Sequence, residues 1–172
     1  MTRQERWDAL SAGPWNDEPN KVQWVSRSTN LDCLIVRGPM GALCGYVGVP
    51  KGHRLYGLDY DVEPMTDLDV HGGLTYAASC QQADADGICH VPQPGRPADV
   101  WWFGFDCGHY MDVVPGMLKY DNPLAGAIVD LSNTLEHVLT PPERRESVAT
   151  YRDIDYVKGQ CTTLAKQIKE LA

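Results

Sequence analysis

Long apolar runs are the first thing that this sequence lacks. Nowhere in its 172 residues is there a stretch approaching the ~18 consecutive apolar residues of a membrane-spanning helix. The opening residues MTRQERWDAL also lack the apolar core of a signal peptide, so we expect a cytoplasmic protein with no membrane anchor. Basic residues are scarce too. The 15 Lys and Arg against 23 Asp and Glu, with a pI near 5.0, argue against direct nucleic-acid binding.

Signatures of common catalytic and nucleotide-binding sites are also missing. There is no P-loop, dinucleotide fingerprint, GxSxG or HExxH motif, and the absence of any CxxC pair argues against a zinc ribbon. A chain of this length buries a core without disulfides, so we expect its six cysteines to be free thiols. The alternative concerns Cys80 and Cys89, which flank a polar loop and could pair or bind a metal.

Hydrophobic periodicity predicts a single α+β domain, with an antiparallel sheet of about five strands and C-terminal helices packed on one face. Strands are expected at residues 21–27, 32–37, 42–49, 70–79 and 99–105. The short connections within residues 21–49 allow only antiparallel neighbours. Capping residues and apolar residues recurring every three or four positions predict helices at 2–10, 123–139 and 151–171.

Acidic residues are concentrated between residues 55 and 112. Ten acids and a single base, Arg96, give this segment a net charge of −9, whereas the rest of the chain carries +1. Three of the five histidines and three of the six cysteines lie in the same segment. One interpretation is a solvated acidic face. The other is a cation site, because carboxylates and imidazoles are ligands of hard and borderline metal ions.

The strongest candidate site begins where the aromatic strand 99–105 ends. Asp106, His109 and Asp112 follow this strand at spacings of three, and His71 lies in another segment, beside two glycines. Two histidines and two carboxylates are a suitable ligand set for a divalent metal, zinc or manganese. In the alternative, the aspartates only accept hydrogen bonds from loop amides and the histidines have structural roles.

A second group of residues is predicted to contact a small ligand. Acidic and aromatic residues alternate at Tyr56, Asp59, Tyr60 and Asp61. One interpretation is a lid that closes over the ligand, and the other is a polar loop with two packing tyrosines. Trp101 and Trp102 point to opposite faces of the sheet, and we assign Trp102 to the wall of the ligand site. Cys107 is two residues from His109, which would activate its thiol if the imidazole reached it.

Four sequence blocks carry a resemblance to a known family. The blocks CGYVGVPKGHRLYG, DVHGGLTY, VWWFGFDCGH and TYRDIDYVKGQC extend over about residues 40–165. They resemble small uncharacterised proteins of bacteriophages and bacteria, actinobacteria among them. The family has no assigned activity, so no functional residue is carried over. The resemblance implies an accessory protein that acts inside the cell, in the host cytoplasm if a phage encodes it.

Three functions are compatible with these features. The first is a divalent-metal site that binds a small ligand and hydrolyses it, which in a phage would serve counter-defence. The second is a non-catalytic protein that sequesters a small molecule. The third is an acidic protein that inhibits a host protein by direct binding. A small molecule or a host protein is therefore the expected partner.

Overall fold

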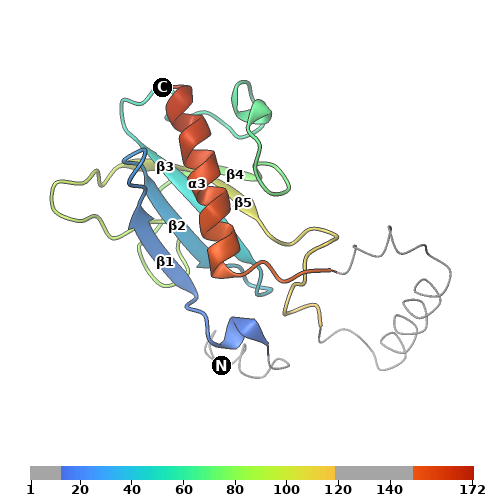
Figure 1. Cartoon of the computed structure of the whole chain (residues 1–172). Helices are drawn as coiled ribbons and strands as arrows, with labels where there is room; N and C mark the ends of the chain where they lie inside the picture. Colours follow the sequence, from blue (N-terminus) through green and yellow to red (C-terminus); the bar gives the residue numbers. More distant parts are fainter. Residues whose placement is uncertain (1–12, 119–148) are drawn as a thin grey trace.

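The computed structural model describes residues 13–118 and 149–172, which form an antiparallel sheet with an α-helix across one face (Figure 1). The elements are η1 (Pro14–Asn16), β1 (Lys21–Val25), β2 (Asp32–Arg37), β3 (Leu43–Pro50), η2 (Met65–Asp67), β4 (Tyr76–Ser79), β5 (Val100–Asp106) and α3 (Ile154–Glu170). The five strands lie in the order β1-β2-β3-β5-β4. The predicted fold class, α+β, is confirmed. The predicted helices 2–10 and 123–139 lie outside the described residues.

Strands β1, β2 and β3 form the antiparallel meander that the short connections predict. Lys21 pairs with Val36 at one end of β1, and Val25 pairs with Asp32 at the other. The chain turns between them at Asn30, whose φ of 61° lies in the left-handed region that asparagine tolerates.

Strand β5 lies between β3 and β4 and is antiparallel to both. The prediction of a strand at 70–79 is wrong for its first half, because β4 begins only at Tyr76. Gly72 and Gly73 have φ values of 68° and 81°, so they make a turn and not an extended segment. This turn carries His71 to the end of β5 from which Asp106 leaves the sheet.

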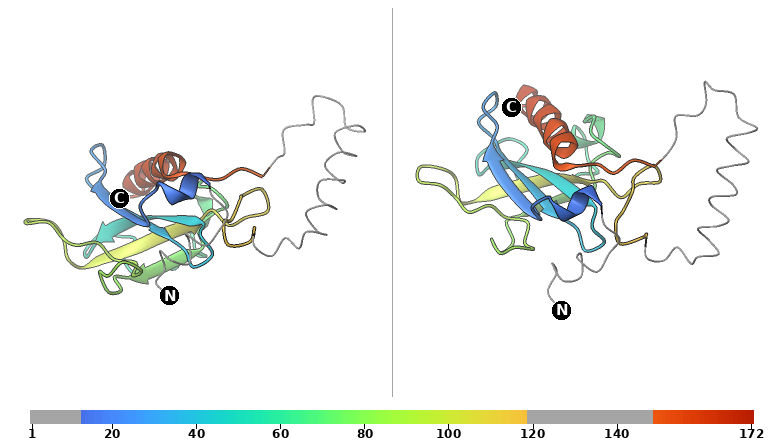
Figure 2. Two further views of the ribbon diagram at one scale, coloured as in Figure 1. Left: turned by 90° about the horizontal axis from the view of Figure 1, so that it is seen from below. Right: turned by 60° about the horizontal axis from the view of Figure 1, so that its bottom comes forward.

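The two faces of the sheet bury separate apolar clusters. Figure 2 shows α3 lying across one face. On this face the buried side chains of α3 form one apolar cluster with Val47, Phe103 and Phe105. The cluster on the other face is smaller and consists of Leu34, Val36, Tyr46, Val100 and Trp102. Cys80 and Ile88 pack against this second cluster, so the segment that follows β4 covers the face away from α3.

Helix α3 matches the helix predicted at 151–171, but it begins three residues later, at Ile154, and ends at Glu170. Its N-cap is Asp153, whose carboxylate accepts a hydrogen bond of 2.8 Å from the Tyr156 N–H. The residues that it buries against the sheet are Val157, Cys161, Leu164, Ala165 and Ile168. No helix in residues 13–118 or 149–172 has the length and apolar composition that crossing a bilayer requires.

A buried arginine ties the start of α3 to the N-terminal part of the chain. Arg37 lies in β2 and is almost fully buried, with Glu18 3.2 Å and the Tyr151 hydroxyl 2.8 Å from its guanidinium. The second carboxylate oxygen of Glu18 accepts the Ile154 N–H at 2.9 Å. These contacts fix the position of residues 151–156, which contribute to the site described below.

The expectation of six free thiols is wrong for one pair of cysteines. Cys80 and Cys89 form a disulfide with their Cα atoms 4.7 Å apart, inside the range that a disulfide requires. They meet because the polar loop folds back on itself, with Gln81 N–H donating to Ile88 O at 3.2 Å. The cysteine content therefore no longer supports the expectation of a cytoplasmic location.

Candidate functional site

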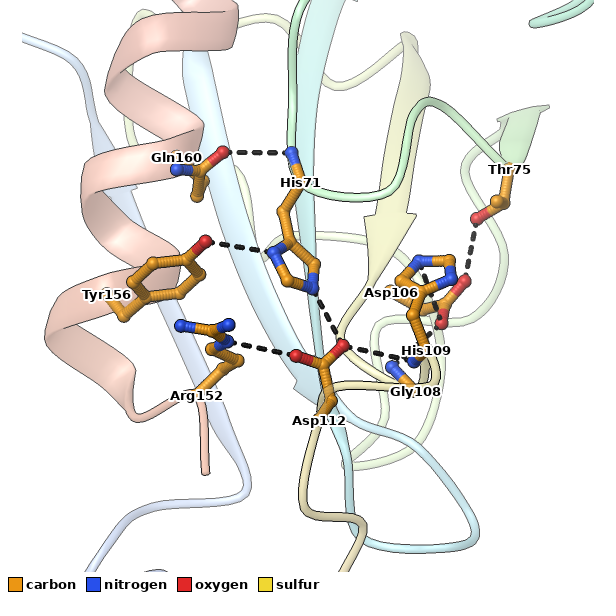
Figure 3. A network of polar contacts seen from close by, with 9 residues as sticks. All are labelled: His71, Thr75, Asp106, Gly108, His109, Asp112, Arg152, Tyr156 and Gln160. Atoms are coloured by element: carbon orange, nitrogen blue, oxygen red, sulfur yellow. Dashed lines mark hydrogen bonds and ion pairs between the residues drawn. The ribbon is translucent and has the colours of Figure 1, made fainter. Parts of the chain in front are cut away.

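The four predicted metal ligands lie together at the end of β5, next to the first turn of α3 (Figure 3). We call the group formed by His71, Asp106, His109 and Asp112 the paired-histidine corner. The centroids of the two histidine rings are 5.5 Å apart. Two elements bring them there: the turn at Gly72 carries His71, and the chain leaving β5 carries the other three residues.

His71 bridges an aspartate and a tyrosine. Its Nε2 lies 2.7 Å from Asp112 Oδ2, and its Nδ1 lies 2.8 Å from the Tyr156 hydroxyl. The His71 backbone N–H donates to Gln160 Oε1 at 2.9 Å. Tyr156 and Gln160 both come from α3, so His71 connects the helix to the 70–75 turn (Figure 3).

Asp112 is a buried carboxylate with three hydrogen-bond donors around it, its side chain being 1% exposed. Besides His71, it accepts the Arg152 Nε–H at 2.9 Å and the His109 backbone N–H at 3.0 Å. Arg152 is in reach because residue 112 forms a parallel bridge with Thr150. Burial alone opposes ionisation of this carboxyl, but the three donors outweigh burial and hold the pKa of Asp112 below its usual value.

The stability of the protein should therefore depend on pH in the acid range. Because the pKa of Asp112 is lower in the folded state than the ~3.9 of an unfolded aspartate, the folded state binds fewer protons in that window. The contribution of Asp112 is complete above about pH 5 and is lost as the pH falls through its folded pKa. We expect the difference in unfolding free energy between the wild type and Asp112→Asn to shrink from pH 6 to pH 3 in urea titrations. An unchanged difference would contradict this account.

The ionised state of Asp112 fixes the protons of its neighbours. A carboxylate only accepts, so His71 Nε2 carries a proton and donates it to Asp112. Burial raises the pKa of Tyr156, so its hydroxyl stays protonated, and this hydroxyl lies 2.8 Å from His71 Nδ1. Both nitrogens of His71 are thus engaged within the protein, and this histidine holds the corner together without offering a nitrogen to a ligand.

His109 has a different environment. Its side chain is 37% exposed, yet its Nε2 atom is buried and has no hydrogen-bond partner. The Asp106 carboxylate lies beside this nitrogen. Its Oδ1 is 3.6 Å from His109 Nε2, slightly beyond hydrogen-bond distance. The ring packs on Gly72 so closely that a Cβ there would lie 1.9 Å from Nε2. A glycine at position 72 is therefore required for this placement of His109.

Asp106 is half exposed and is held in place by local donors. Its Oδ1 accepts the Gly108 N–H at 3.0 Å, and its Oδ2 accepts the Thr75 hydroxyl at 3.1 Å. Part of the alternative interpretation thus holds, since both aspartates accept loop amides. Asp106 nevertheless keeps one side open to solvent, whereas Asp112 does not.

The ligand atoms of the paired-histidine corner do not converge on one point. In the described residues, the sole set of three or more His, Cys, Asp or Glu with ligand atoms within 4.8 Å of one another is Cys80, Cys89 and His90. At the corner, only His109 and Asp106 present an unengaged nitrogen beside an accessible carboxylate. A divalent metal bound by all four residues would require Asp112 to give up part of its contact with Arg152.

The predicted lid is not at this site. The Tyr56 hydroxyl donates to Asp99 Oδ1 at 2.5 Å, and Asp99 precedes β5. Asp106 is at the other end of this strand, about 23 Å away at ~3.3 Å per residue. The remaining lid residues, Asp59, Tyr60 and Asp61, are exposed and make no hydrogen bond with the paired-histidine corner.

Two further residues that the sequence analysis assigned to functional roles, Trp102 and Cys107, are buried. Trp102 is 0% exposed and packs on the sheet face away from α3, so it forms no wall of the paired-histidine corner. Trp101, on the opposite face as predicted, donates to Leu58 O at 2.9 Å. Cys107 is buried in the core under α3, and burial raises the pKa of its thiol, so His109 does not activate it as a nucleophile.

Sequence reasoning missed the contribution of residues 152–160, which include the start of α3. Arg152 and Tyr156 contact Asp112 and His71, and the Arg152 guanidinium also lies 4.7 Å above the Tyr156 ring. Tyr156 and Gln160 are spaced by four, so they share one side of α3, and Arg152 lies in the chain just before the N-cap Asp153. Polar residues placed beside the apolar stripe were the signal available in the sequence.

Comparisons with known proteins provide no independent assignment. The chain matches no family model, no curated protein and no solved structure.

Proposed function

We propose that this chain binds a small polar ligand at the paired-histidine corner and that His109 exchanges a proton with the ligand or with an adjacent water, as in a hydrolase. The observation that supports the proposal is the two-sided environment of His109. Its Nε2 faces Asp106 from a buried position, while the rest of the ring reaches solvent. A histidine with a carboxylate beside one nitrogen and a free second nitrogen has the arrangement of a general base.

The neighbouring His71 network supplies rigidity. Asp112 joins His71, Arg152 and the His109 backbone through hydrogen bonds of 2.7 to 3.0 Å. These residues come from the 70–75 turn, from the segment just before α3 and from the segment after β5, so the network connects three parts of the chain. A proton-transfer group must be held in a fixed orientation to act efficiently, and this network holds the chain at His109.

A divalent metal, zinc or manganese, is the second candidate ligand of the corner. The separation of 3.6 Å between His109 Nε2 and Asp106 Oδ1 favours it, because two ligands at ~2.0–2.1 Å from one zinc ion lie about 3.3 Å apart. Arg152 beside Asp112 opposes it, since a fixed positive charge repels a cation. The metal would therefore be coordinated mainly by Asp106 and His109.

The second candidate function is non-catalytic. A phage accessory protein could sequester a small molecule at this corner, or use its acidic segment to bind a host protein. Both functions require the corner or the acidic surface to bind, and neither requires His109 to transfer a proton.

Hydrolysis of 4-nitrophenyl acetate and bis(4-nitrophenyl) phosphate tests the proposal. We expect turnover by the wild type to fall about 100-fold in His109→Ala, the lower range for loss of a general base. Gly72→Ala should have a similar effect, because its Cβ would displace the His109 ring. Gly73→Ala is the matched control: it has the same kind of positive φ and no atom within 4 Å of the added Cβ, so it should keep its rate within threefold.

The same assay separates the two candidates. Activity that survives EDTA supports a metal-free general base, whereas activity lost in EDTA and restored by Zn²⁺ or Mn²⁺ supports the metal. Equal rates for the wild type and His109→Ala would rule out both chemical roles. Binding would then have to be tested on its own, as a non-catalytic function.

A further inference from the structure

A second cluster of reactive side chains lies on the sheet face away from α3. It consists of Cys80, Cys89 and His90, the converging set noted above. His90 Nδ1 lies 3.8 Å from the sulfur of Cys80 and 4.0 Å from that of Cys89. Neither the fold nor the proposed function of the paired-histidine corner accounts for this arrangement.

The orientation of His90 leaves one nitrogen aimed at the two sulfurs. His90 is 3% exposed, and its Nε2 lies 2.8 Å from the Pro97 carbonyl. A carbonyl only accepts, so Nε2 carries the proton and Nδ1 presents a lone pair. Disulfide sulfurs carry no hydrogen, so this buried lone pair receives no hydrogen bond from them, which is unusual in a folded protein. Metal-binding histidines are oriented in the same way, with the other nitrogen donating to a carbonyl.

The environment of Cys80 suits a thiolate. The indole Nε1–H of the fully buried Trp102 donates to Cys80 Sγ at 3.2 Å, and an N–H donor stabilises negative charge on sulfur. The ring of Trp102 also packs edge-on against His90, with centroids 5.4 Å apart. Cys80 is half-buried, whereas Cys89 and His90 are buried, so the cluster lies nearest to solvent at Cys80.

The loop that carries Cys89 is held in place by contacts other than the disulfide. The Lys21 ammonium donates to the Asp84 and Gly87 carbonyls at 2.6 and 2.8 Å. The Gln23 side-chain amide pairs with the Val91 backbone through two hydrogen bonds, of 2.9 and 2.8 Å. Both anchors lie in β1. Breaking the disulfide therefore leaves the three ligand side chains close together.

We propose that Cys80, Cys89 and His90 form a redox-controlled binding site for a thiophilic divalent cation such as Zn²⁺. A dithiol reductant supplies two electrons and two protons, which cleave the disulfide to two thiols, and the reductant is itself oxidised to a disulfide. The cation then binds two thiolate sulfurs and His90 Nδ1, with release of the two thiol protons. A water molecule occupies the fourth position.

Titration with Co²⁺ tests this site in the full-length protein. The protein is reduced without denaturant by tris(2-carboxyethyl)phosphine, desalted without oxygen and titrated with the metal. We expect one equivalent to bind with a thiolate-to-cobalt charge-transfer band in the near ultraviolet. Cys80→Ser and Cys89→Ser should abolish the band, and His90→Ala should weaken binding at least tenfold. Cys44→Ser, which alters a cysteine outside the disulfide, should behave as the wild type.

Several results would overturn the proposal. They are the absence of a charge-transfer band from the reduced wild type, an unchanged band in Cys80→Ser, an equal band from the oxidised protein, and a disulfide that resists reduction in the folded chain. If His90→Ala no longer unfolds cooperatively, the two cysteine variants and the oxidised protein decide the matter. The His109→Ala variant should bind Co²⁺ here as the wild type does, so this test is independent of the proposed function.

Discussion

Replacing Asp112 by asparagine is expected to lower the free energy of unfolding by about 3 kcal/mol, a large part of the ~5–15 kcal/mol of a typical domain. The substitution keeps the volume but removes the charge from a side chain that is 1% exposed. Arg152 then loses its buried counterion, and an amide NH₂ group faces either His71 or Arg152, both of which are donors. Urea unfolding at pH 7, followed by circular dichroism, measures the change.

Asp106→Asn is the matched control for this prediction. Asp106 is half exposed, and an asparagine oxygen can still accept the Gly108 N–H and the Thr75 hydroxyl. We expect a change in unfolding free energy below about 1 kcal/mol. Equal losses for the two substitutions would show that the buried charge of Asp112 contributes no more to stability than the exposed charge of Asp106.

Truncation after Gly159 is expected to abolish cooperative unfolding altogether. It removes Cys161, Leu164, Ala165 and Ile168, which are all 0% exposed and face the sheet. Burial of each large aliphatic side chain contributes ~1.5–3 kcal/mol, and the sheet face left behind would expose Phe103 and Phe105. It also removes Gln160, which accepts the His71 backbone N–H. Thermal melts followed by near-ultraviolet circular dichroism test the loss.

Point substitutions in α3 separate packing from chain length. Leu164→Ala should cost about 2–5 kcal/mol, whereas Lys166→Ala, on the exposed side of the same helix, should change stability by less than about 0.5 kcal/mol. A truncated chain that still melts cooperatively near the temperature of the full-length protein would show that α3 is an appendage.

Local sequence signals predicted most of the sheet. The segments that became β1, β2, β3 and β5 have alternating or apolar residues bounded by turn residues, and these features depend only on near neighbours. The first half of the strand predicted at 70–79 was wrong, because Gly72 adopts a positive φ and packs against His109, a residue far along the chain. The Gly72-Gly73 pair is compatible with an extended strand or with a turn, and only the contact with His109 decides between them.

The paired-histidine corner was predicted in its residues but not in its chemistry. The spacing of Asp106, His109 and Asp112 after a buried strand indicated that they leave it together. The distinct roles of the two aspartates depend on burial: Asp112 lies beneath Arg152 and His71, whereas Asp106 faces solvent. Burial is set by the packing of α3, and α3 is more than 40 residues further along the sequence from Asp106.

The sequence by itself determined the fold class, the antiparallel meander, the apolar stripe of α3 and the identity of the residues at the corner, because each depends on spacing within one segment. Only the tertiary structure placed the Tyr56 loop at the far end of β5, buried Trp102 beside His90, and brought Cys80 and Cys89 together. It also placed Arg152 and Tyr156 beside Asp112 and His71. The physical reason is that these contacts join segments whose separation in space is fixed by the packing of the two sheet faces, and spacing along the chain carries no information about that packing.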